Sequence, residues 1–324
     1  MSRTDIVIQT EHLSIEAARW LGERCRLVEC SHRSAEFERI IADAAGLVAR
    51  TYTVVDEPLL AKAKNLRVVG RAGVGLDNID LAACRRRGIA VVYTPDANTQ
   101  AVVEYVVGLL ADAFRPRSTI DQALSIDQWN QLRQTTVGKR QMSELTLGIL
   151  GLGRVGKRLV QAARGIGFTV IYNDLLEIAA EHRAGAEHVD LRNLFHQSDI
   201  VSIHIDGRPG NRGFVGASLV QLMKPEGVLI NTSRGFVVDN LALASFFRGR
   251  PNALAMLDVH DPEPFDATYP LLGLPNVRLY PHLASRTETA MNNMSWVVRD
   301  VMAVLEGRKP EFPAPANPRL NGDS

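Results

Sequence analysis

Three glycines at a fixed spacing lie between an apolar run and a helical pattern. The stretch Leu145–Leu159 reads LTLGILGLGRVGKRL and holds Gly151, Gly153 and Gly156. Taken alone, such glycines also serve ordinary turns and close helix packing. Between a strand and a helix, they permit a tight turn, close approach of the backbone to a pyrophosphate, and helix–strand contact. Because the N-terminus of the helix would face the phosphates, this context predicts a dinucleotide site.

An acidic residue ends the next expected strand, FTVIYND. Asp174 lies eighteen residues beyond Gly156, where a carboxylate can accept hydrogen bonds from the adenosine ribose hydroxyls. The next two residues, Leu175 and Leu176, offer no cation to a 2′-phosphate. The pattern therefore favours NAD over NADP. A role as a helix cap or turn residue is the alternative for Asp174.

Three further strand ends carry groups suited to proton transfer and anion binding: Arg234 in INTSRG, Glu263 in LDVHDPEPF and His282 in YPHLASRT. Loops at the carboxyl ends of parallel strands line a ligand crevice, so these side chains could meet over a nicotinamide. An imidazole exchanges protons near neutral pH, a carboxylate can fix its tautomer, and a guanidinium can fork onto an anion. The alternatives are a strand cap for the histidine, a solvated loop acid for the glutamate and a surface ion pair for the arginine.

A second glycine-rich turn, RAGVGLDN, follows an earlier strand. Its consecutive backbone N–H groups at Gly73, Val74 and Gly75 could form a concavity for a carboxylate. A tight turn without a ligand is the alternative.

The elements that would position these groups alternate in a βαβ rhythm, which favours parallel sheets covered by helices. The first series of strands reads DIVIQT, RLVEC, GLVART, LRVVGRAG and AVVYTP. The second series reads TLGILGLG, FTVIYND, DIVSIHI, GVLINTSRG, ALAMLDV and VRLYPH. Two series predict two sheets.

Two apolar helical patterns connect the predicted sheets. Asn98–Arg115 would cross between domains, and Glu288–Gly307 would return to the first, followed by an extended tail, KPEFPAPANPRL. We therefore expect an α/β protein of two doubly wound parallel-sheet domains. A Rossmann NAD-binding domain (101–285) would be inserted into a discontinuous, flavodoxin-like substrate domain (1–100 and 286–324), with a cleft between them.

Composition limits the partners. The chain has 324 residues, 46% hydrophobic and 23% charged, and its 37 basic and 36 acidic side chains leave a net charge of +1. No global field would draw it onto nucleic acid or an anionic membrane. No run approaches the ~20 apolar residues of a membrane span, and the apolar run in the opening stretch MSRTDIVIQTEHLS is too short for a signal peptide. We therefore expect a cytoplasmic protein. The spacing of Cys25, Cys30 and Cys84 predicts neither disulfides nor a metal site.

Five ordered blocks carry a family resemblance: VVGRAGVGLDNIDLAACRRRGIAVVYTP, LGILGLGRVGKRL, LINTSRGFVVDN, AMLDVHDPEP and PHLASRTETAMNN. From about Leu66 to Gly307 the chain resembles the D-isomer-specific 2-hydroxyacid dehydrogenases, most closely the branch containing D-3-phosphoglycerate dehydrogenase. The resemblance implies NAD-dependent hydride transfer between nicotinamide and a D-2-hydroxy or 2-oxo acid. The substrate would be 3-phosphoglycerate-like, hydroxypyruvate or glyoxylate. Because charge grows on the carbonyl oxygen, the reaction needs a proton donor and a fixed cation.

The resemblance also assigns site residues. Arg234, Glu263 and His282 would be catalytic, and the substrate would be bound by Gly73, Val74, Gly75 and Arg234. The cofactor would be bound by Gly151, Gly153, Arg154, Val155, Gly156, Asp174, Ile205, Thr232, Ser233 and Asp258. Family members form a two-fold dimer through the segment 118–143, so we expect a homodimer that buries Trp129.

Several positions depart from the family pattern: Tyr280 replaces a usual Thr, Asp206 replaces a common Pro, and Arg286 lies where a small residue is usual. These changes leave the particular acid open. The arginines that could favour a phosphorylated or dianionic substrate, or could be solvated surface charges, are Arg71, Arg208, Arg212 and Arg286. The alternative function is an NAD(H)-binding, redox-sensing interaction protein of the same fold, like the corepressors of this family.

Overall fold

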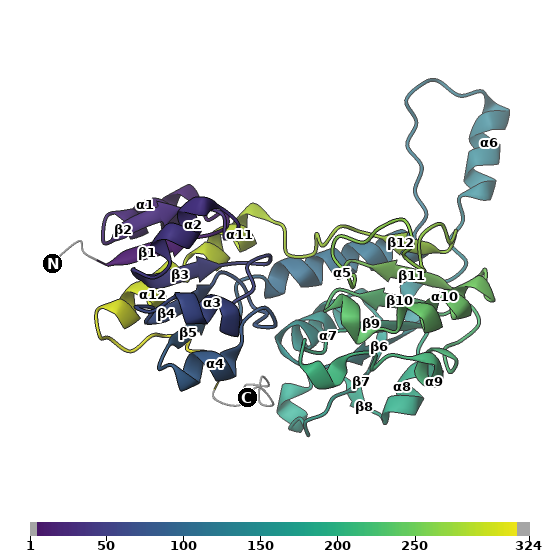
Figure 1. Ribbon diagram of the computed structural model, residues 1–324. Coiled ribbons are helices and arrows are strands. Elements are labelled where there is room, and N and C mark those ends of the chain that lie inside the picture. Colours follow the sequence, from purple (N-terminus) through teal and green to yellow (C-terminus); the bar gives the residue numbers. More distant parts are fainter. Residues whose placement is uncertain (1–4, 316–324) are drawn as a thin grey trace. The chain divides into compact units, whose positions relative to one another are not determined.

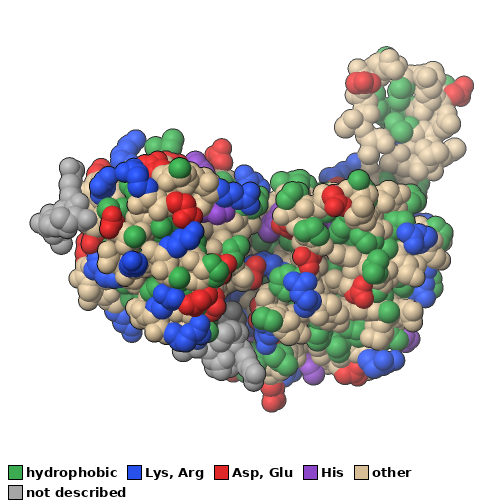
Figure 2. All heavy atoms as spheres, in the orientation of Figure 1, with side chains coloured by type: hydrophobic (Ala, Val, Ile, Leu, Met, Phe, Trp, Pro, Cys, Tyr) green, Lys and Arg blue, Asp and Glu red, His purple; other side chains and the backbone are tan. Residues whose placement is uncertain are grey.

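The computed structural model describes residues 5–315, which divide into two compact units (Figure 1). Unit 1 contains residues up to 98 and from 285 onward, and unit 2 contains residues 99–284. Each unit holds one all-parallel sheet. On the face seen in Figure 2, acidic and basic side chains are intermixed, in keeping with the small net charge.

Unit 1 has a five-stranded sheet in the order β2-β1-β3-β4-β5, which is the flavodoxin-like order. Its strands are β1 (Ile6–Gln9), β2 (Arg26–Glu29), β3 (Ala44–Ala49), β4 (Val68–Arg71) and β5 (Ala90–Tyr93). Its first four helices are α1 (Ile15–Gly22), α2 (Ala35–Ile40), α3 (Glu57–Lys62) and α4 (Leu81–Arg86). All six residues of central β3 are buried, as expected of a parallel strand covered on both faces.

The predicted single helix over Glu288–Gly307 is wrong, because the structure has two helices, α11 (Glu288–Ser295) and α12 (Val298–Leu305). The Ser295 hydroxyl donates to the carbonyl of Met291 at 2.7 Å, a bond that tends to bend helices. The next two N–H groups then bond three residues back instead of four. Sequence periodicity does not reveal this shift, since the apolar pattern continues through it.

Helix α12 packs tightly on the sheet of unit 1. A Cβ on Gly70 of β4 would lie 2.4 Å from a methyl carbon of Val301, so only glycine allows this approach. The extended tail beyond α12 then pairs with the edge strand β5. The N–H of Ala314 donates to the carbonyl of Val91 at 2.7 Å, which covers a sheet edge. The tail is extended as expected up to 315, and its residues 316–320 lie outside the described part.

Unit 2 has a seven-stranded sheet in the order β12-β11-β10-β9-β6-β7-β8. The strands are β6 (Thr146–Leu150), β7 (Thr169–Asn173), β8 (Glu187–His188), β9 (Ile200–Ile203), β10 (Val228–Asn231), β11 (Leu254–Leu257) and β12 (Val277–Leu279). The strand order reverses between β6 and β9, as in the Rossmann fold. The predicted fold class is confirmed. The two-residue β8 was not predicted, because both of its side chains are exposed and carry no apolar pattern.

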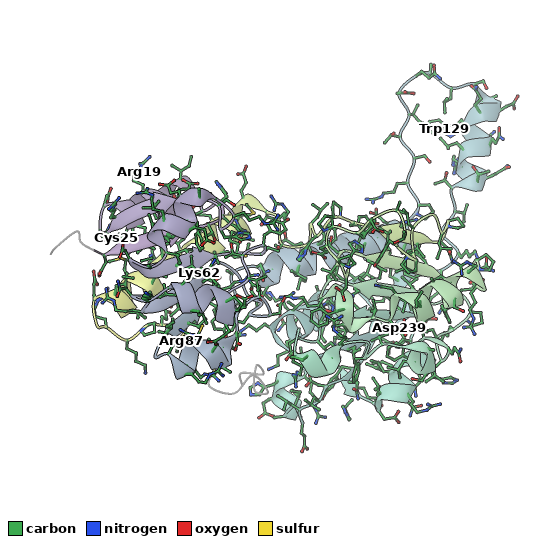
Figure 3. All side chains as sticks on the ribbon, viewed as in Figure 1. Arg19, Cys25, Lys62, Arg87, Trp129 and Asp239 are labelled. Atoms are coloured by element: carbon green, nitrogen blue, oxygen red, sulfur yellow. The ribbon has the colours of Figure 1, made fainter. Side chains whose placement is uncertain are left out.

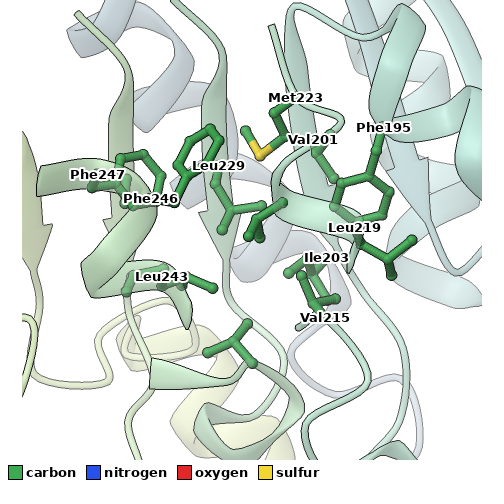
Figure 4. Packing of buried hydrophobic residues seen from close by; sticks show 14 of the residues in the cluster. Phe195, Val201, Ile203, Val215, Leu219, Met223, Leu229, Leu243, Phe246 and Phe247 are labelled. Atoms are coloured by element: carbon green, nitrogen blue, oxygen red, sulfur yellow. The ribbon is translucent and has the colours of Figure 1, made fainter. Parts of the chain in front are cut away.

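Helices cover both faces of this sheet. They are α5 (Thr99–Phe114), α7 (Arg154–Ile166), α8 (Leu191–Gln197), α9 (Ala217–Val220) and α10 (Asn240–Arg248). Strand β10 alternates: Leu229 joins the core under α8, α9 and α10 that Figure 4 shows, whereas Val228 and Ile230 join the core under α5 and α7. Two-sided burial explains the continuous apolar strands of the sequence.

One helix of unit 2 contributes to neither core. Helix α6 (Ile126–Thr135) begins at a capping box of Ser125 and Gln128 and has no buried residue. Its Trp129, labelled in Figure 3, is 46% exposed. Short 3-10 helices complete the described chain: η1 (Met142–Glu144), η2 (Ala180–His182), η3 (Pro209–Asn211) and η4 (Gly235–Val237). A search of residues 5–315 for a helix of the length and apolarity needed to span a membrane finds none.

Candidate active site

The glycine loop after β6 has the geometry that a pyrophosphate requires. Gly151 has φ +98°, and a Cβ there would lie 2.9 Å from the backbone of His204. A Cβ on Gly156 would lie 2.2 Å from the carbonyl oxygen of Gly151, whereas a Cβ on Gly153 would meet no atom of the described chain within 4 Å apart from its own neighbours in sequence. Helix α7 begins directly after Gly153 without a side-chain cap. The first and third glycines therefore close the turn, and the second leaves open backbone N–H groups that fit a phosphate.

Asp174 is anchored to this loop. One carboxylate oxygen accepts the N–H of Leu152 at 2.6 Å, and the other accepts the N–H of Leu176 at 2.8 Å. The bond from Leu176 closes a turn, which is the alternative role considered for Asp174. The bond from Leu152 fixes the carboxylate beside the glycines. Both uses leave lone pairs on the carboxylate for ribose hydroxyls.

Three further cofactor candidates lie in the segments that follow strands β6 and β9. Arg154 and Val155 are the first two residues of α7. Ile205 is the second residue after the end of β9 and directly follows His204. The His204 N–H donates to the carbonyl of Leu150 at 2.7 Å, which joins the two loops. Burial lowers the pKa of His204 to about 4, so this imidazole is neutral at physiological pH.

A hydrogen-bonded turn after β10 sets the backbone of Arg234. The Asn231 side chain accepts from the N–H and hydroxyl of Ser233 at 3.0 and 2.8 Å, and donates to the Arg234 carbonyl at 2.9 Å. A Cβ on Gly235 would lie 1.9 Å from the carbonyl carbon of His260, so the loops after β10 and β11 are in contact. Glycine at 235 thus brings the guanidinium-bearing loop against the one that carries Glu263.

Two buried polar groups lie near these strand ends. The Thr232 hydroxyl is buried and has no hydrogen-bond partner within the described chain, which suits contact with a bound cofactor. Asp258 is fully buried and accepts the N–H groups of Leu283 and Ala284 at 2.7 and 2.8 Å. Burial raises the pKa of Asp258, and those two bonds oppose the effect. Asp258 therefore holds the loop after β12, a role that sequence reasoning missed.

Glu263 and His282 are in direct contact. An Oε2···Nδ1 distance of 2.8 Å joins them, and the other Glu263 oxygen accepts the N–H of His260 at 2.7 Å. Burial raises the pKa of Glu263, but the hydrogen bonds and charges of His282 and His260 together outweigh it and bring the pKa below its usual value. Glu263 is therefore an anion that orients the imidazole. His282 has φ +55°, unusual for a non-glycine residue and a mark of a constrained position.

The strands bring the three candidate residues to one edge of the sheet. Asn231, at the end of β10, pairs with Leu257 of β11, which pairs with Leu279 of β12 (Figure 1). Arg234 and His282 each follow their strand by three residues, and Glu263 follows by six.

His260, which sequence reasoning missed, supports the loop of Glu263. Its ring bonds the Tyr280 carbonyl at 2.8 Å and the Tyr269 hydroxyl at 3.3 Å, and Phe265 stacks on Tyr269 with ring centroids 4.4 Å apart. The available signal was a histidine between a buried strand and the DPEP turn.

The candidate substrate turn lies in unit 1. Gly73 has φ +148°, and its carbonyl accepts the Thr94 N–H at 3.2 Å. Val74 and Gly75 follow it and are partly exposed. The Arg71 guanidinium lies against Gly73, since a Cβ there would be 1.5 Å from its Nη1.

The four arginines for which the sequence left two roles open differ in their partners and in their exposure. Arg208 and Arg212 pair with carboxylates, those of Asp206 and Asp261 respectively. Arg71 donates to the carbonyl of its neighbour, Ala72, at 3.0 Å. Arg286 is exposed, and its charge contributes to lowering the pKa of Arg50, after burial. Arg208 is thus a half-buried ion pair, whereas Arg212, 64% exposed, is a solvated surface charge, the alternative considered above.

Comparison with known proteins agrees with the fold. Residues 107–284 match the family model of the D-isomer specific 2-hydroxyacid dehydrogenase, NAD binding domain. The chain is 30% identical to D-3-phosphoglycerate dehydrogenase of Archaeoglobus fulgidus (93% of this chain, 57% of the relative). It is 36% identical to glyoxylate reductase of Aeropyrum pernix (79% and 78%). The crystal structure of a Thermus thermophilus protein, TT0316, superposes with a TM-score of 0.81 at 30% identity, over 96% of this chain and 100% of that one.

The chain belongs to the D-isomer specific 2-hydroxyacid dehydrogenase family, and unit 2 carries its NAD-binding domain. The family resemblance predicted from the motifs is confirmed. The chain spans little more than half of the Archaeoglobus relative.

Proposed function

We propose that the protein is an NAD-dependent dehydrogenase of a D-2-hydroxy acid. The observation that carries this proposal is the 2.8 Å contact between Glu263 and His282 beside the dinucleotide-binding sheet. The substrate would be a small 2-oxo or 2-hydroxy acid, of the 3-phosphoglycerate-like, hydroxypyruvate or glyoxylate kind.

Each residue of the catalytic set would have one task. Since Nδ1 of His282 bonds Glu263, Nε2 is the atom that would give a proton to the substrate oxygen or take it back. The anionic Glu263 stabilises the imidazolium and holds the ring orientation. Arg234 would bind the substrate carboxylate and the reacting oxygen through its planar fork. The bound dinucleotide would supply or accept the hydride.

The two sheets would divide the work. Residues 101–285 would bind NAD through the glycine loop, Asp174, Ile205, the turn 232–233 and Asp258. Residues 1–100 and 286–324 would bind the substrate, with the N–H groups of Gly73, Val74 and Gly75 facing its carboxylate. Arg154 and Val155 at the start of α7 would face the pyrophosphate, where their backbone dipoles favour an anion.

A homodimer through the segment 118–143 is supported by its exposed apolar side chains. Ile126 is 71% and Trp129 46% exposed, which a partner surface would cover. Light scattering tests this: Trp129→Asp should shift the dimer toward monomer. A cytoplasmic location is supported by the three buried free thiols, Cys25, Cys30 and Cys84, which are usual in a reducing compartment.

The test of the reaction is NADH oxidation across a panel of 2-oxo acids, with His282→Ala as the control. We expect turnover with at least one acid and little with the variant. Tight NADH binding without turnover of any acid would contradict the proposal and favour a redox-sensing interaction protein.

A further inference from the structure

The loop after β9 contains a bidentate ion pair whose carboxylate accepts two further hydrogen bonds. Both Nε and Nη2 of Arg208 donate to the Asp206 carboxylate, at 2.6 and 2.5 Å. The same carboxylate accepts the backbone N–H of Arg208 at 3.2 Å and the side-chain amide of Asn211 at 3.0 Å. Each side chain of the pair is only 25% exposed. The guanidinium is therefore held in one orientation by a carboxylate that is itself fixed.

This ion pair adjoins the glycine loop and Asp174. Gly151 packs against the backbone of His204, two residues before Asp206. Asp174 accepts the N–H of Leu152 in the same glycine loop. The charge of Asp174 also acts on Arg208: its pKa is raised mainly by Asp206 and to a smaller extent by Asp174. A guanidinium and two carboxylates thus lie around one end of the dinucleotide site.

This arrangement bears on the choice between NAD and NADP, which differ by a phosphate on the ribose 2′ oxygen. An arginine near the ribose is the usual partner of that phosphate. Arg208 is such a cation, but Asp206 binds the Nε–Nη2 edge of its guanidinium, one of the two edges that could fork onto a phosphate, and offsets its charge. With Asp174, the three groups sum to one net negative charge, which repels a dianion.

We propose that Asp206 is a specificity-determining residue that excludes NADP by holding Arg208 in an ion pair. Without the Asp206 charge, Arg208 would become a 2′-phosphate site beside Asp174. The inference rests on dinucleotide binding in the proposed function, and does not depend on which acid is turned over.

Dissociation constants for NADPH and NADH, measured by fluorescence titration, test it without the reaction. Asp206→Asn should tighten NADPH binding about tenfold while changing NADH binding much less. The double variant Asp206→Asn/Arg208→Gln should lose that gain, because the gain depends on the released guanidinium. Unchanged NADPH affinity in the single variant, or an equal gain in the double variant, would overturn the proposal.

A similar ion pair in unit 1 provides the matched control. Arg308 donates through Nε to Glu306, also two residues away, at 2.9 Å. Glu306→Gln removes the same charge and should change neither dissociation constant. A gain in NADPH affinity equal to that of Asp206→Asn would overturn the proposal, since net charge alone would then explain it.

Arg208→Gln alone gives a second route if Asp206→Asn does not fold, as judged by circular dichroism. It leaves two uncompensated carboxylates, so NADPH affinity should fall about tenfold, and unchanged or tighter binding would overturn the proposal. Absence of NADH binding by the unmodified protein would reject the proposed function together with this inference. Intact NADH binding with unaltered selectivity in every variant would reject this inference alone.

Discussion

Two glycine-rich turns follow parallel strands in this protein, one in each unit, and they differ in what comes next. After Gly153, helix α7 begins at once and runs for 13 residues without a side-chain cap. After Gly75, five residues precede α4, which has six residues and whose first turn is closed by Asp80, a bond of 2.8 Å to the Ala83 N–H.

The difference shows why glycine content alone does not define an anion site. In unit 2 the end of a long helix, with its dipole and open N–H groups, is available to a pyrophosphate. In unit 1 the helix end is already capped by a carboxylate, so only the turn itself, around Gly73, can bind an anion. This difference supports our proposal that a pyrophosphate binds at the first turn and a substrate carboxylate at the second.

The largest expected effect comes from a residue in neither turn. His282→Ala should lower kcat by about 10²–10⁴-fold, because the proton donor is lost, with little change in NADH affinity since both anion sites remain. Steady-state kinetics and NADH titration measure the two quantities. Retained turnover would remove His282 from the mechanism.

Replacing Gly156 should disrupt the pyrophosphate turn. In Gly156→Val, a Cβ 2.2 Å from the Gly151 carbonyl oxygen forces α7 away from β6. We expect NADH affinity to fall about tenfold to a hundredfold and Tm to drop. Calorimetry and titration check both, and native values for the two would show that the turn tolerates a side chain.

Gly153→Ala and Gly73→Ala separate the two turns directly. Open space surrounds Gly153, so Gly153→Ala should preserve Tm yet weaken NADH binding about tenfold by blocking backbone approach. Gly73→Ala places alanine at φ +148° and displaces Arg71, so it should raise KM for the 2-oxo acid about tenfold and spare NADH affinity. A higher KM for the 2-oxo acid in Gly153→Ala, together with weaker NADH binding in Gly73→Ala, would contradict our interpretation of the two turns.

The smallest expected effect is on stability at acid pH. Because burial lowers the pKa of His204 to about 4, the unfolded chain binds a proton between about pH 6.5 and 4 that the folded chain does not. Stability should therefore fall as the pH drops through that window, by roughly 5 °C in Tm. His204→Asn cannot titrate, so its Tm should vary less over this range. Equal pH dependence in both proteins would exclude His204 as the cause.

Several features of the site were predictable from short stretches of sequence. The glycines at 151, 153 and 156, and the carboxylate at 174, follow from backbone geometry and strand alternation within some thirty residues. Two parallel sheets follow from βαβ repetition, but the strand order within each does not, and the seventh strand of the larger sheet, β8, was not predicted. The break between α11 and α12 was missed, because a serine hydroxyl bonded to its own helix leaves no periodic signal.

The sequence by itself determines the local structure, because a turn, a helix cap or a buried strand depends on residues only a few positions away. It does not determine partnerships across loops: Glu263 with His282, and Asp258 with the N–H groups of Leu283 and Ala284. Those contacts depend on which strands lie side by side and in which register, and register is set by packing of the whole sheet. The sequence thus determines which chemical groups are present at the strand ends, and the tertiary structure determines which of them are in contact.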